Sequence, residues 1–517
     1  MTTGEAPPRT PEAPPSTPAR GGDPDAAVDS IKQSAVRGVG WTSFIHGYRI
    51  TMGLVTTWVL AILLGQSAFG LVGSAAVIVG FLVMLKDLGT GAAIVQRKNL
   101  SDSVLSSIFW TNVILGVVGT IALYASAPVI AWVLQSQELI PIIHALAFMV
   151  LLAGLGTTHQ SLLQRELRFA HLAKIETIAI TAGAVAGITG AILGAGVWAL
   201  VLQSLATMGL TTLLAVSLHS WRPSRTLRIK DVRGVAKFSL NLTAFNICNY
   251  ILKSADQLLV FRFMGSAQAG IYYLAIKMLM LPLSSINSVL SRVLFPLFAK
   301  IQDDDDRLRN AFLKVTATIA TLVFPFVVGF AVMAQPVVAG LLPEKWLPVV
   351  PLITALAIVA ALHSLSTSTG NLYLAKGRTD ILLLWGLGAC VCGVTAYAIG
   401  VQFGAVGVAR AYAVVTIVTF LPAIWIPMRL IRAPLRSFFP VVWRPALSAS
   451  LMGGVVVGCG AILDLPPLLD VAIRVPVGAV AYVLFSLWIN GEHIRQVVQL
   501  LRARDDTPSG NEKSSAA

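Results

Sequence analysis

Charge is scarce in this sequence. Only 12% of its 517 residues are Asp, Glu, Lys or Arg, and 56% are hydrophobic. Soluble globular domains carry roughly 25% charged residues, so the composition excludes a soluble protein. The formal net charge is +14, but the basic residues sit mostly in alternate loops. A nucleic-acid footprint would gather them on one soluble face, so no nucleic-acid partner is predicted.

Cysteine is also scarce, and the motifs of several chemistries are missing. All four cysteines fall inside apolar runs, and Cys390 and Cys392 point to different sides of one helix. Disulfide and metal chemistry are therefore not predicted. The sequence lacks a G-x-x-x-x-G-K-[ST] motif, which cradles the phosphates of ATP. We predict no cofactor and no enzymatic activity, and we expect gradients or substrate flux to drive any work.

Long apolar runs fill the rest of the chain. They recur from Gly40 to Asn490 with short polar breaks, and each has the roughly 20 residues that cross a bilayer. The sequence predicts an all-α polytopic membrane protein of about fourteen transmembrane helices. The expected spans are 40–64, 68–95, 105–134, 140–164, 173–194, 196–219, 236–260, 266–296, 311–333, 347–370, 379–402, 404–428, 440–463 and 467–489.

The loops between these spans alternate in charge. If the N-terminus is cytoplasmic, the inner loops collect nearly all loop Lys and Arg residues, and the outer loops hold only Arg262 and Lys345. This alternation follows the positive-inside rule and predicts that both termini are cytoplasmic. The first 30 residues are rich in proline and lack the apolar stretch of a signal peptide, so we expect a disordered tail.

An internal repeat divides the chain. Residues 64–70 (LGQSAFG) are echoed by 264–270 (MGSAQAG), and 194–197 (GAGV) by 404–408 (GAVGV). Each pair joins corresponding spans, which indicates two six-helix lobes plus two appended helices. The predicted boundaries are a cytoplasmic tail (1–35), an N-terminal lobe (36–220), a basic linker (221–235), a C-terminal lobe (236–432), two further helices (433–490) and a cytoplasmic tail (491–517).

Basic residues outnumber acidic ones inside the spans. A basic side chain at the centre of a membrane helix costs roughly 2.5–3.5 kcal/mol on insertion scales, so it usually faces a cavity or a partner. Arg49 and Lys277 are deep and lack a local partner, and they are the preferred anion-binding residues. Lys86, Arg292 and Arg410 are expected to form a supporting ring, although Lys86 and Arg292 are also placed to snorkel to the headgroups.

Polar residues form stripes in the first and seventh spans. His46 precedes Arg49 by three residues, and Asn246, Asn249, Lys253 and Asp256 lie on one face of a helix. The repeat offset matches His46 with Asn246 and Arg49 with Asn249, so both stripes are expected to line one cleft. Asp256 is the candidate for ion coupling. Its alternative is a plain ion pair with Lys253, three residues earlier.

The ordered motifs of residues 30–431 resemble the oligosaccharide and polysaccharide flippases of the multidrug/oligosaccharidyl-lipid/polysaccharide exporter superfamily. The motifs are 64–70, 256–259 (DQLL) before Gly265, 270–272 (GIY), 294–296 (LFP) and 375–378 (AKGR), with Phe261 where a small residue is expected. The resemblance implies a central cavity lined by the first and seventh helices. It also implies alternating access and an oligosaccharide linked to a polyprenyl pyrophosphate carrier.

The sequence therefore predicts a flippase of the bacterial cytoplasmic membrane. It would move a lipid-linked oligosaccharide to the external leaflet, with membrane lipids and other polysaccharide assembly proteins as partners. One alternative is a cation-coupled multidrug exporter, which would carry acidic residues in its cavity. A membrane polysaccharide polymerase would need a large external loop, and every predicted external loop is short. A lipid scaffold without transport activity also stays open.

Overall fold

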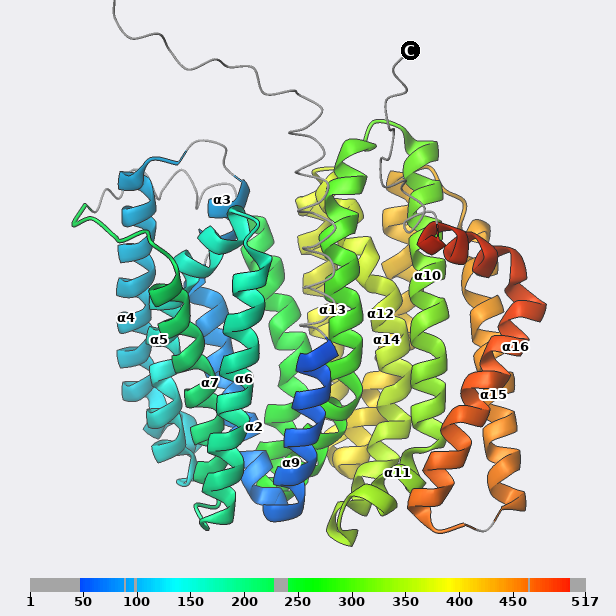
Figure 1. Cartoon of the computed structure of the whole chain (residues 1–517), viewed down its shortest axis with the longest axis horizontal. Helices are drawn as coiled ribbons and strands as arrows, with labels where there is room; N and C mark the ends of the chain where they lie inside the picture. Colours follow the sequence, from blue (N-terminus) through cyan, green and yellow to red (C-terminus); the bar gives the residue numbers. More distant parts are fainter. Residues whose placement is uncertain (1–46, 88–89, 97–99, 227–239, 464, 503–517) are drawn as a thin grey trace, which may run out of the picture.

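The protein is a bundle of long, roughly parallel and antiparallel helices (Figure 1). The structure, a computed structural model, describes residues 47–87, 90–96, 100–226, 240–463 and 465–502. These residues form no strand, and ten of their helical stretches are long and apolar enough to span a bilayer. One of those stretches, Thr379–Leu430, contains two helices. The all-α membrane fold is confirmed, and the predicted N-terminal tail (1–35) lies outside the described residues.

The N-terminal lobe consists of a first helix and six further elements. They are Gly47–Leu63, α2 (Gln66–Asp87), α3 (Thr90–Gln96), α4 (Asp102–Leu134), α5 (Leu139–Arg165), α6 (Phe169–Ile192) and α7 (Val197–Leu218). The second span was predicted to run unbroken over 68–95, but α2 ends at Asp87. The Asp87 carboxylate accepts hydrogen bonds from Thr90 Oγ1 (3.0 Å) and the Gly91 amide (3.4 Å). The Asp87 carboxylate thus satisfies one of the free amides in the first turn of α3.

The C-terminal lobe begins with α9 (Leu240–Lys300) and ends with α14. The elements between them are α10 (Asp305–Val332), α11 (Ala334–Leu341), η2 (Glu344–Val349), α12 (Val350–Ala375) and α13 (Thr379–Gly400), and α14 is Gly404–Leu430. The appended helices α15 (Phe439–Ile462) and α16 (Pro467–Arg502) pack on α10 and α11. Helix α16 continues beyond the predicted end of the last span at residue 489, so the predicted tail (491–517) begins as helix.

Helix α9 is a hairpin of two spans. Gly265 breaks it with φ 83°, a conformation that glycine adopts at little cost. Two bonds cross the hairpin, from Gln257 Nε2 to the Ala269 carbonyl (3.1 Å) and from the Tyr272 hydroxyl to Asp256 (2.8 Å). Lys253 and Lys277 each lie twelve residues from Gly265. At 1.5 Å per residue both are about 18 Å from the break, so they share one depth.

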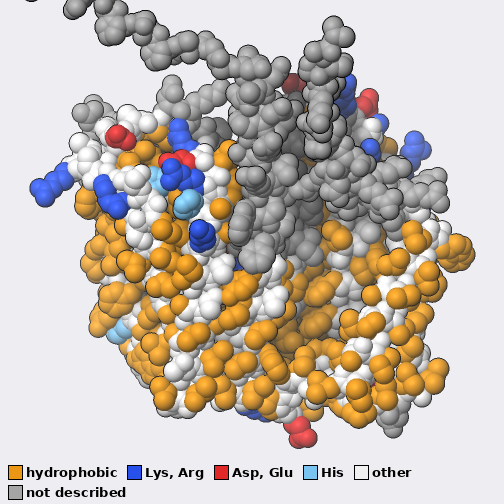
Figure 2. Space-filling model, in the orientation of Figure 1, with side chains coloured by type: hydrophobic (Ala, Val, Ile, Leu, Met, Phe, Trp, Pro, Cys, Tyr) orange, Lys and Arg blue, Asp and Glu red, His pale blue; other side chains and the backbone are white. Residues whose placement is uncertain are grey.

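The surface divides into an apolar wall and a basic end. Figure 2 shows hydrophobic side chains over the flanks and Lys and Arg side chains gathered at one end. We call this the basic end. It holds Arg168, Arg222, Lys376, Arg378, Arg432 and Arg436, whereas Gly65, Glu138, Gly265 and Glu344 lie at the opposite end. The prediction that the basic end is cytoplasmic remains a prediction, as do the numbered lobe and linker boundaries.

Candidate functional site

The two lobes meet closely at the opposite end, where the sequence repeat falls. A methyl group on Gly70 would overlap the carbonyl oxygen of Ser266, and one on Gly270 would overlap the carbonyl oxygen of Gln66. The contacts are reciprocal, because Gly70 and Gly270 occupy equivalent positions of the repeat. Only glycine lets the two backbones approach this closely.

Hydrogen bonds also hold the first helix to the C-terminal lobe at this end. The Lys345 ammonium donates to the Leu64 carbonyl (2.8 Å), and Trp346 Nε1 donates to the Ala61 carbonyl (2.8 Å). Trp58 Nε1 donates to the carbonyl of Leu341. The carbonyls at the end of the first helix thus find donors from the other lobe. In this conformation the lobes are joined at the opposite end.

Lys277 and Arg49, the preferred anion-binding residues, differ in burial. Lys277 is half-buried, and its ammonium lies 5.7 Å from the ring centroid of Tyr273, close enough for a cation–π contact. Tyr273 in turn packs against Gly73 of α2, which puts Lys277 beside the lobe interface. Arg49 is exposed on the first helix. Neither forms an ion pair with another described residue.

The described residues of the α9 stripe have different surroundings, and the shared cleft remains a prediction. His46 lies outside the described residues, and Asn246 is exposed. Asn249 and Lys253 line a cavity of about 280 Å³ inside the C-terminal lobe, between the first half of α9 and helices α12, α13 and α14. Small-molecule pockets begin at about 300 Å³, so this cavity is near their lower limit. Sequence reasoning missed it because its walls come from four helices far apart in the chain.

Asp256 turns away from that cavity. Its side chain is fully buried and accepts a hydrogen bond from the Tyr272 hydroxyl at 2.8 Å. The alternative ion pair with Lys253 does not form between these two described residues. Residues three apart on a helix differ by about 60° in direction, which is enough to put Lys253 in the cavity and Asp256 in the hairpin. Ion coupling through Asp256 stays a prediction.

The three residues of the expected supporting ring have different surroundings. Lys86 is only 5% exposed and donates to Thr157 Oγ1 of α5 at 3.0 Å, so it lies inside the N-terminal lobe. Arg410 is exposed and lines a mostly apolar pocket of about 300 Å³ with α13 and η3 (Val401–Phe403), near the opposite end. Arg292 lies on α9, and its side chain is outside the described part of the chain. The ring remains a prediction.

Helix α10 lies between two apolar cavities that the sequence did not reveal. One of about 280 Å³ is lined by Leu54 and Trp58 of the first helix and by Leu274 and Met278 of α9. The other, about 440 Å³, lies between α10 and the appended helices α15 and α16. Three residues line both: Phe326, Phe330 and Val337. Leu274 and Met278 flank Lys277, so apolar space adjoins its helix face.

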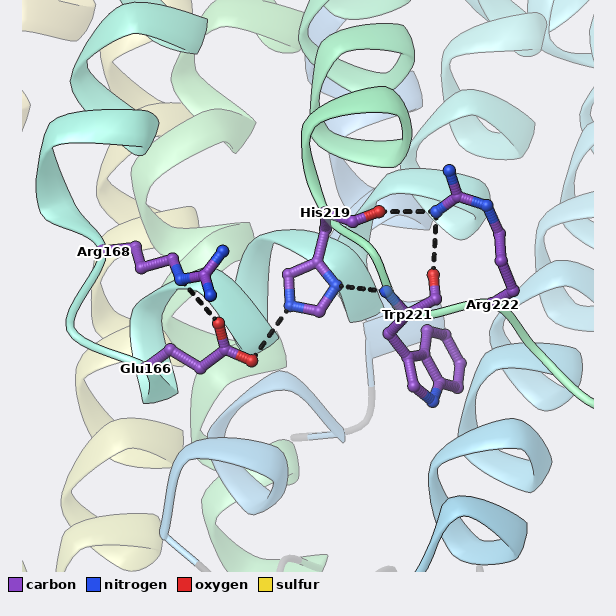
Figure 3. Close-up of polar contacts among 5 residues, drawn as sticks. All are labelled: Glu166, Arg168, His219, Trp221 and Arg222. Atoms are coloured by element: carbon purple, nitrogen blue, oxygen red, sulfur yellow. Dashed lines mark hydrogen bonds and ion pairs between the residues drawn. The ribbon is translucent and has the colours of Figure 1, made fainter.

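A polar cluster fixes the basic end of the N-terminal lobe. In Figure 3, His219 Nε2 contacts Glu166 at 3.1 Å and its Nδ1 accepts from the Trp221 amide at 3.0 Å. Glu166 also pairs with Arg168 at 2.9 Å, and Arg222 donates to the His219 carbonyl at 2.5 Å. These contacts join the α5–α6 loop to the chain leaving α7. We assign the cluster a structural role.

Comparison with known proteins defines the class of protein first. The structure of lipid II flippase MurJ in its inward closed conformation matches with a TM-score of 0.70 over 88% of this chain and 99% of that chain, at 15% identity. At that identity the match shows the fold alone. The chain therefore has the fold of that flippase.

Sequence relatives define the family. The polysaccharide biosynthesis protein family matches residues 59–351. Teichuronic acid biosynthesis protein TuaB of Bacillus subtilis is 32% identical over 78% of this chain and 84% of its own length. Lipopolysaccharide biosynthesis protein WzxC of Escherichia coli is 30% identical over 80% of this chain and 85% of its own. The chain belongs to the polysaccharide biosynthesis protein family and is a multi-pass membrane protein.

Proposed function

We propose that the protein moves a lipid-linked oligosaccharide from the cytoplasmic to the external leaflet of the bacterial inner membrane by alternating access. One observation carries the proposal. Lys277 forms no ion pair with a described residue, and its helix neighbours Leu274 and Met278 line an apolar cavity between the first helix and α9. A polyprenyl pyrophosphate has the complementary chemistry, an anionic head on an apolar chain. In a low-dielectric cleft the attraction of a cation for that head exceeds its value in water.

The names of the relatives support a saccharide as the cargo. TuaB is named for teichuronic acid biosynthesis and WzxC for lipopolysaccharide biosynthesis, and the fold is shared with a lipid II flippase. We infer that the cargo here is likewise a saccharide on a lipid carrier. Membrane lipids and other polysaccharide assembly proteins are the proposed partners.

The junction of the lobes at the opposite end supports alternating access. The Gly70 and Gly270 contacts and the bonds from Lys345 and Trp346 join the lobes there. If the opposite end is external, release of the cargo requires these contacts to separate. A second conformation is therefore part of the proposal.

The multidrug exporter alternative fits the described residues less well. It calls for acidic groups that face the cavity and bind cationic drugs, and Asp256 is fully buried against Tyr272. The cavity inside the C-terminal lobe presents Lys253 instead. A polymerase would need catalytic residues on a large external loop, and the connections at the opposite end are short.

The test is leaflet translocation of a labelled polyprenyl pyrophosphate sugar in proteoliposomes, normalised to reconstituted protein. Lys277→Gln and Arg49→Gln should lose most translocation, and Lys277→Arg should retain part of it, because charge rather than shape binds the pyrophosphate. Arg262→Gln is the matched control, since Arg262 lies over Phe263 at the opposite end. Wild-type rates in both Gln variants would contradict the anion site. Transport of cationic drugs by the parent protein would favour the exporter alternative.

A further inference from the structure

The cavity inside the C-terminal lobe has the chemistry of a sugar site. Resting on the proposed function, we propose that it binds an acidic sugar unit of the translocated oligosaccharide, with Lys253 holding the carboxylate and Tyr373 donating a hydrogen bond. The cavity is walled by α9, α12, α13 and α14. We infer the chemistry of the ligand from the hydrogen-bond donors and acceptors of the lining residues that have no partner within the protein.

Lys253 is the cation of the cavity. The side chain is exposed to the cavity space, and it forms no ion pair with a described residue. The lining residues include no Asp or Glu, and the other titratable groups among them are His363, Tyr373 and Tyr412. His363 Nε2 and the Tyr412 hydroxyl lie 3.0 Å apart and satisfy one another. An ammonium without a counter-ion in a cavity of low dielectric attracts an anionic group more strongly than it would in water.

Tyr373 supplies an independent observation in favour of a ligand site. Its side chain is only 1% exposed and lines the cavity, yet its hydroxyl has no hydrogen-bond partner. Buried polar groups without a partner are rare in folded proteins and call for an explanation. An acceptor atom of a bound molecule would satisfy this hydroxyl.

The remaining polar groups favour a polyhydroxyl molecule. Ser366, Thr367 and Thr419 line the cavity, and each donates its hydroxyl proton to the carbonyl four residues earlier on its own helix, at 3.0, 3.1 and 2.7 Å. Their oxygens therefore offer acceptor lone pairs. Sugar hydroxyl groups can donate to them, and the ring of Trp385 adds an apolar wall. A simple inorganic anion has no use for these acceptors or this wall.

The two lysines of α9 would bind different parts of the substrate, Lys277 the pyrophosphate head group and Lys253 the sugar. Lys253 and Lys277 lie at one depth on opposite arms of the hairpin, but Lys277 is beside the lobe interface and Lys253 faces the interior of the C-terminal lobe. Pyrophosphate at Lys277 and a sugar carboxylate at Lys253 would give a substrate two separate anchors. Lys253 is then a specificity-determining residue for acidic cargo.

The experiment compares two substrates that share one polyprenyl pyrophosphate anchor and differ only in a terminal glucuronate or glucose. Lys253→Gln should slow translocation of the glucuronate substrate by roughly tenfold or more, as loss of a charge-assisted hydrogen bond allows, and should leave the glucose substrate unchanged. Lys253→Arg should rescue the acidic substrate. Tyr373→Phe should lower it by a smaller factor, whereas the control Tyr482→Phe, which loses a bond to Thr321 on α10, should not discriminate between substrates.

Equal loss of both substrates in Lys253→Gln would overturn the inference, because Lys253 would then serve the anchor or the fold. Failure of the wild type to move either substrate would contradict the proposed function rather than this site. A second readout decides the site in that case. Free glucuronate, and not glucose, should protect Lys253 of the intact protein from amine labelling detected by mass spectrometry. Equal labelling with and without glucuronate would contradict the site.

Discussion

The two lobes repeat one helix order but fill their interiors differently. In the N-terminal lobe, Gly154 of α5 admits the backbone of α4, since a methyl group on it would lie 2.6 Å from the Asn112 carbonyl oxygen. In the C-terminal lobe, Gly386 makes room for the ring of Phe245, which itself borders the cavity. Small residues allow membrane helices to pack backbone to backbone.

The difference shows how a repeated framework can carry one site. The N-terminal lobe places its buried lysine, Lys86, against a partner hydroxyl on Thr157. The C-terminal lobe places Lys253 and Tyr373 in the walls of a cavity, Lys253 without an ion pair to a described residue and the buried hydroxyl of Tyr373 without a hydrogen-bond partner. We interpret the first lobe as a packed support and the second as the lobe that receives cargo.

The largest loss of stability is expected at Gly70 and Gly270, the equivalent repeat positions where the two lobes touch. Gly70→Ala and Gly270→Ala should each sharply reduce folded protein and lower the thermal unfolding midpoint, because each new methyl overlaps a backbone carbonyl. Overpacking costs roughly 1–3 kcal/mol or more. Gly388→Ala in α13 is the control, since nothing lies within 4 Å of the added methyl. If one variant lost much more folded protein or thermal stability than the other, the Gly70 and Gly270 contacts would not be equivalent.

The next prediction separates the lobes. Gly154→Ala should destabilise the protein by about 1–3 kcal/mol because the Asn112 backbone cannot yield. Gly386→Ala should cost less, because the Phe245 ring can move toward the cavity. Denaturant unfolding in detergent measures both. A larger loss of unfolding free energy in Gly386→Ala than in Gly154→Ala would contradict this difference between the lobes.

A third prediction concerns the buried lysine of the N-terminal lobe. Thr157→Val should lower stability by about 1–3 kcal/mol, because it leaves the ammonium of Lys86 without its described acceptor. Thr318→Val is the control, since its exposed hydroxyl bonds only within α10. Wild-type stability of the Thr157 variant would mean that Lys86 is not held by this bond and is free for the ring first expected of it.

The smallest prediction uses two matching helix ends. Arg168 donates to Leu163 and Arg378 to Tyr373, each at 2.9 Å through its backbone amide, and the residue before each is left-handed: Leu167 (φ 56°) and Gly377 (φ 67°). Left-handed leucine costs roughly 1–2 kcal/mol. Leu167→Gly should therefore raise stability by a fraction of a kcal/mol after the entropy cost of glycine, and Gly377→Ala should lower it. A lower unfolding midpoint for Leu167→Gly, or a higher one for Gly377→Ala, would contradict the equivalence of the two helix ends.

The sequence predicted the helices better than their interiors. Apolar runs indicated about fourteen spans, and the repeat of residues 64–70 at 264–270 indicated two lobes. The break after Asp87 was missed because, in sequence, an aspartate that bonds to the next helix looks the same as a single charge inside a continuous membrane helix. Lys253 was placed on one stripe with Asp256, yet the two face different surroundings. Which side a polar residue faces depends on neighbouring helices, so the C-terminal cavity could not be found from one chain segment.

The central claim is that the lobes separate at the opposite end to release a lipid-linked sugar. Trp58 and Leu341 touch there and are both exposed, so they suit a reversible lock. In a background lacking the four native cysteines, Trp58→Cys and Leu341→Cys would be joined by a short reducible crosslinker, with each single variant treated as a control. The account predicts that crosslinking stops translocation of the labelled substrate in proteoliposomes and that reduction restores it. Undiminished translocation by the crosslinked protein would contradict the account.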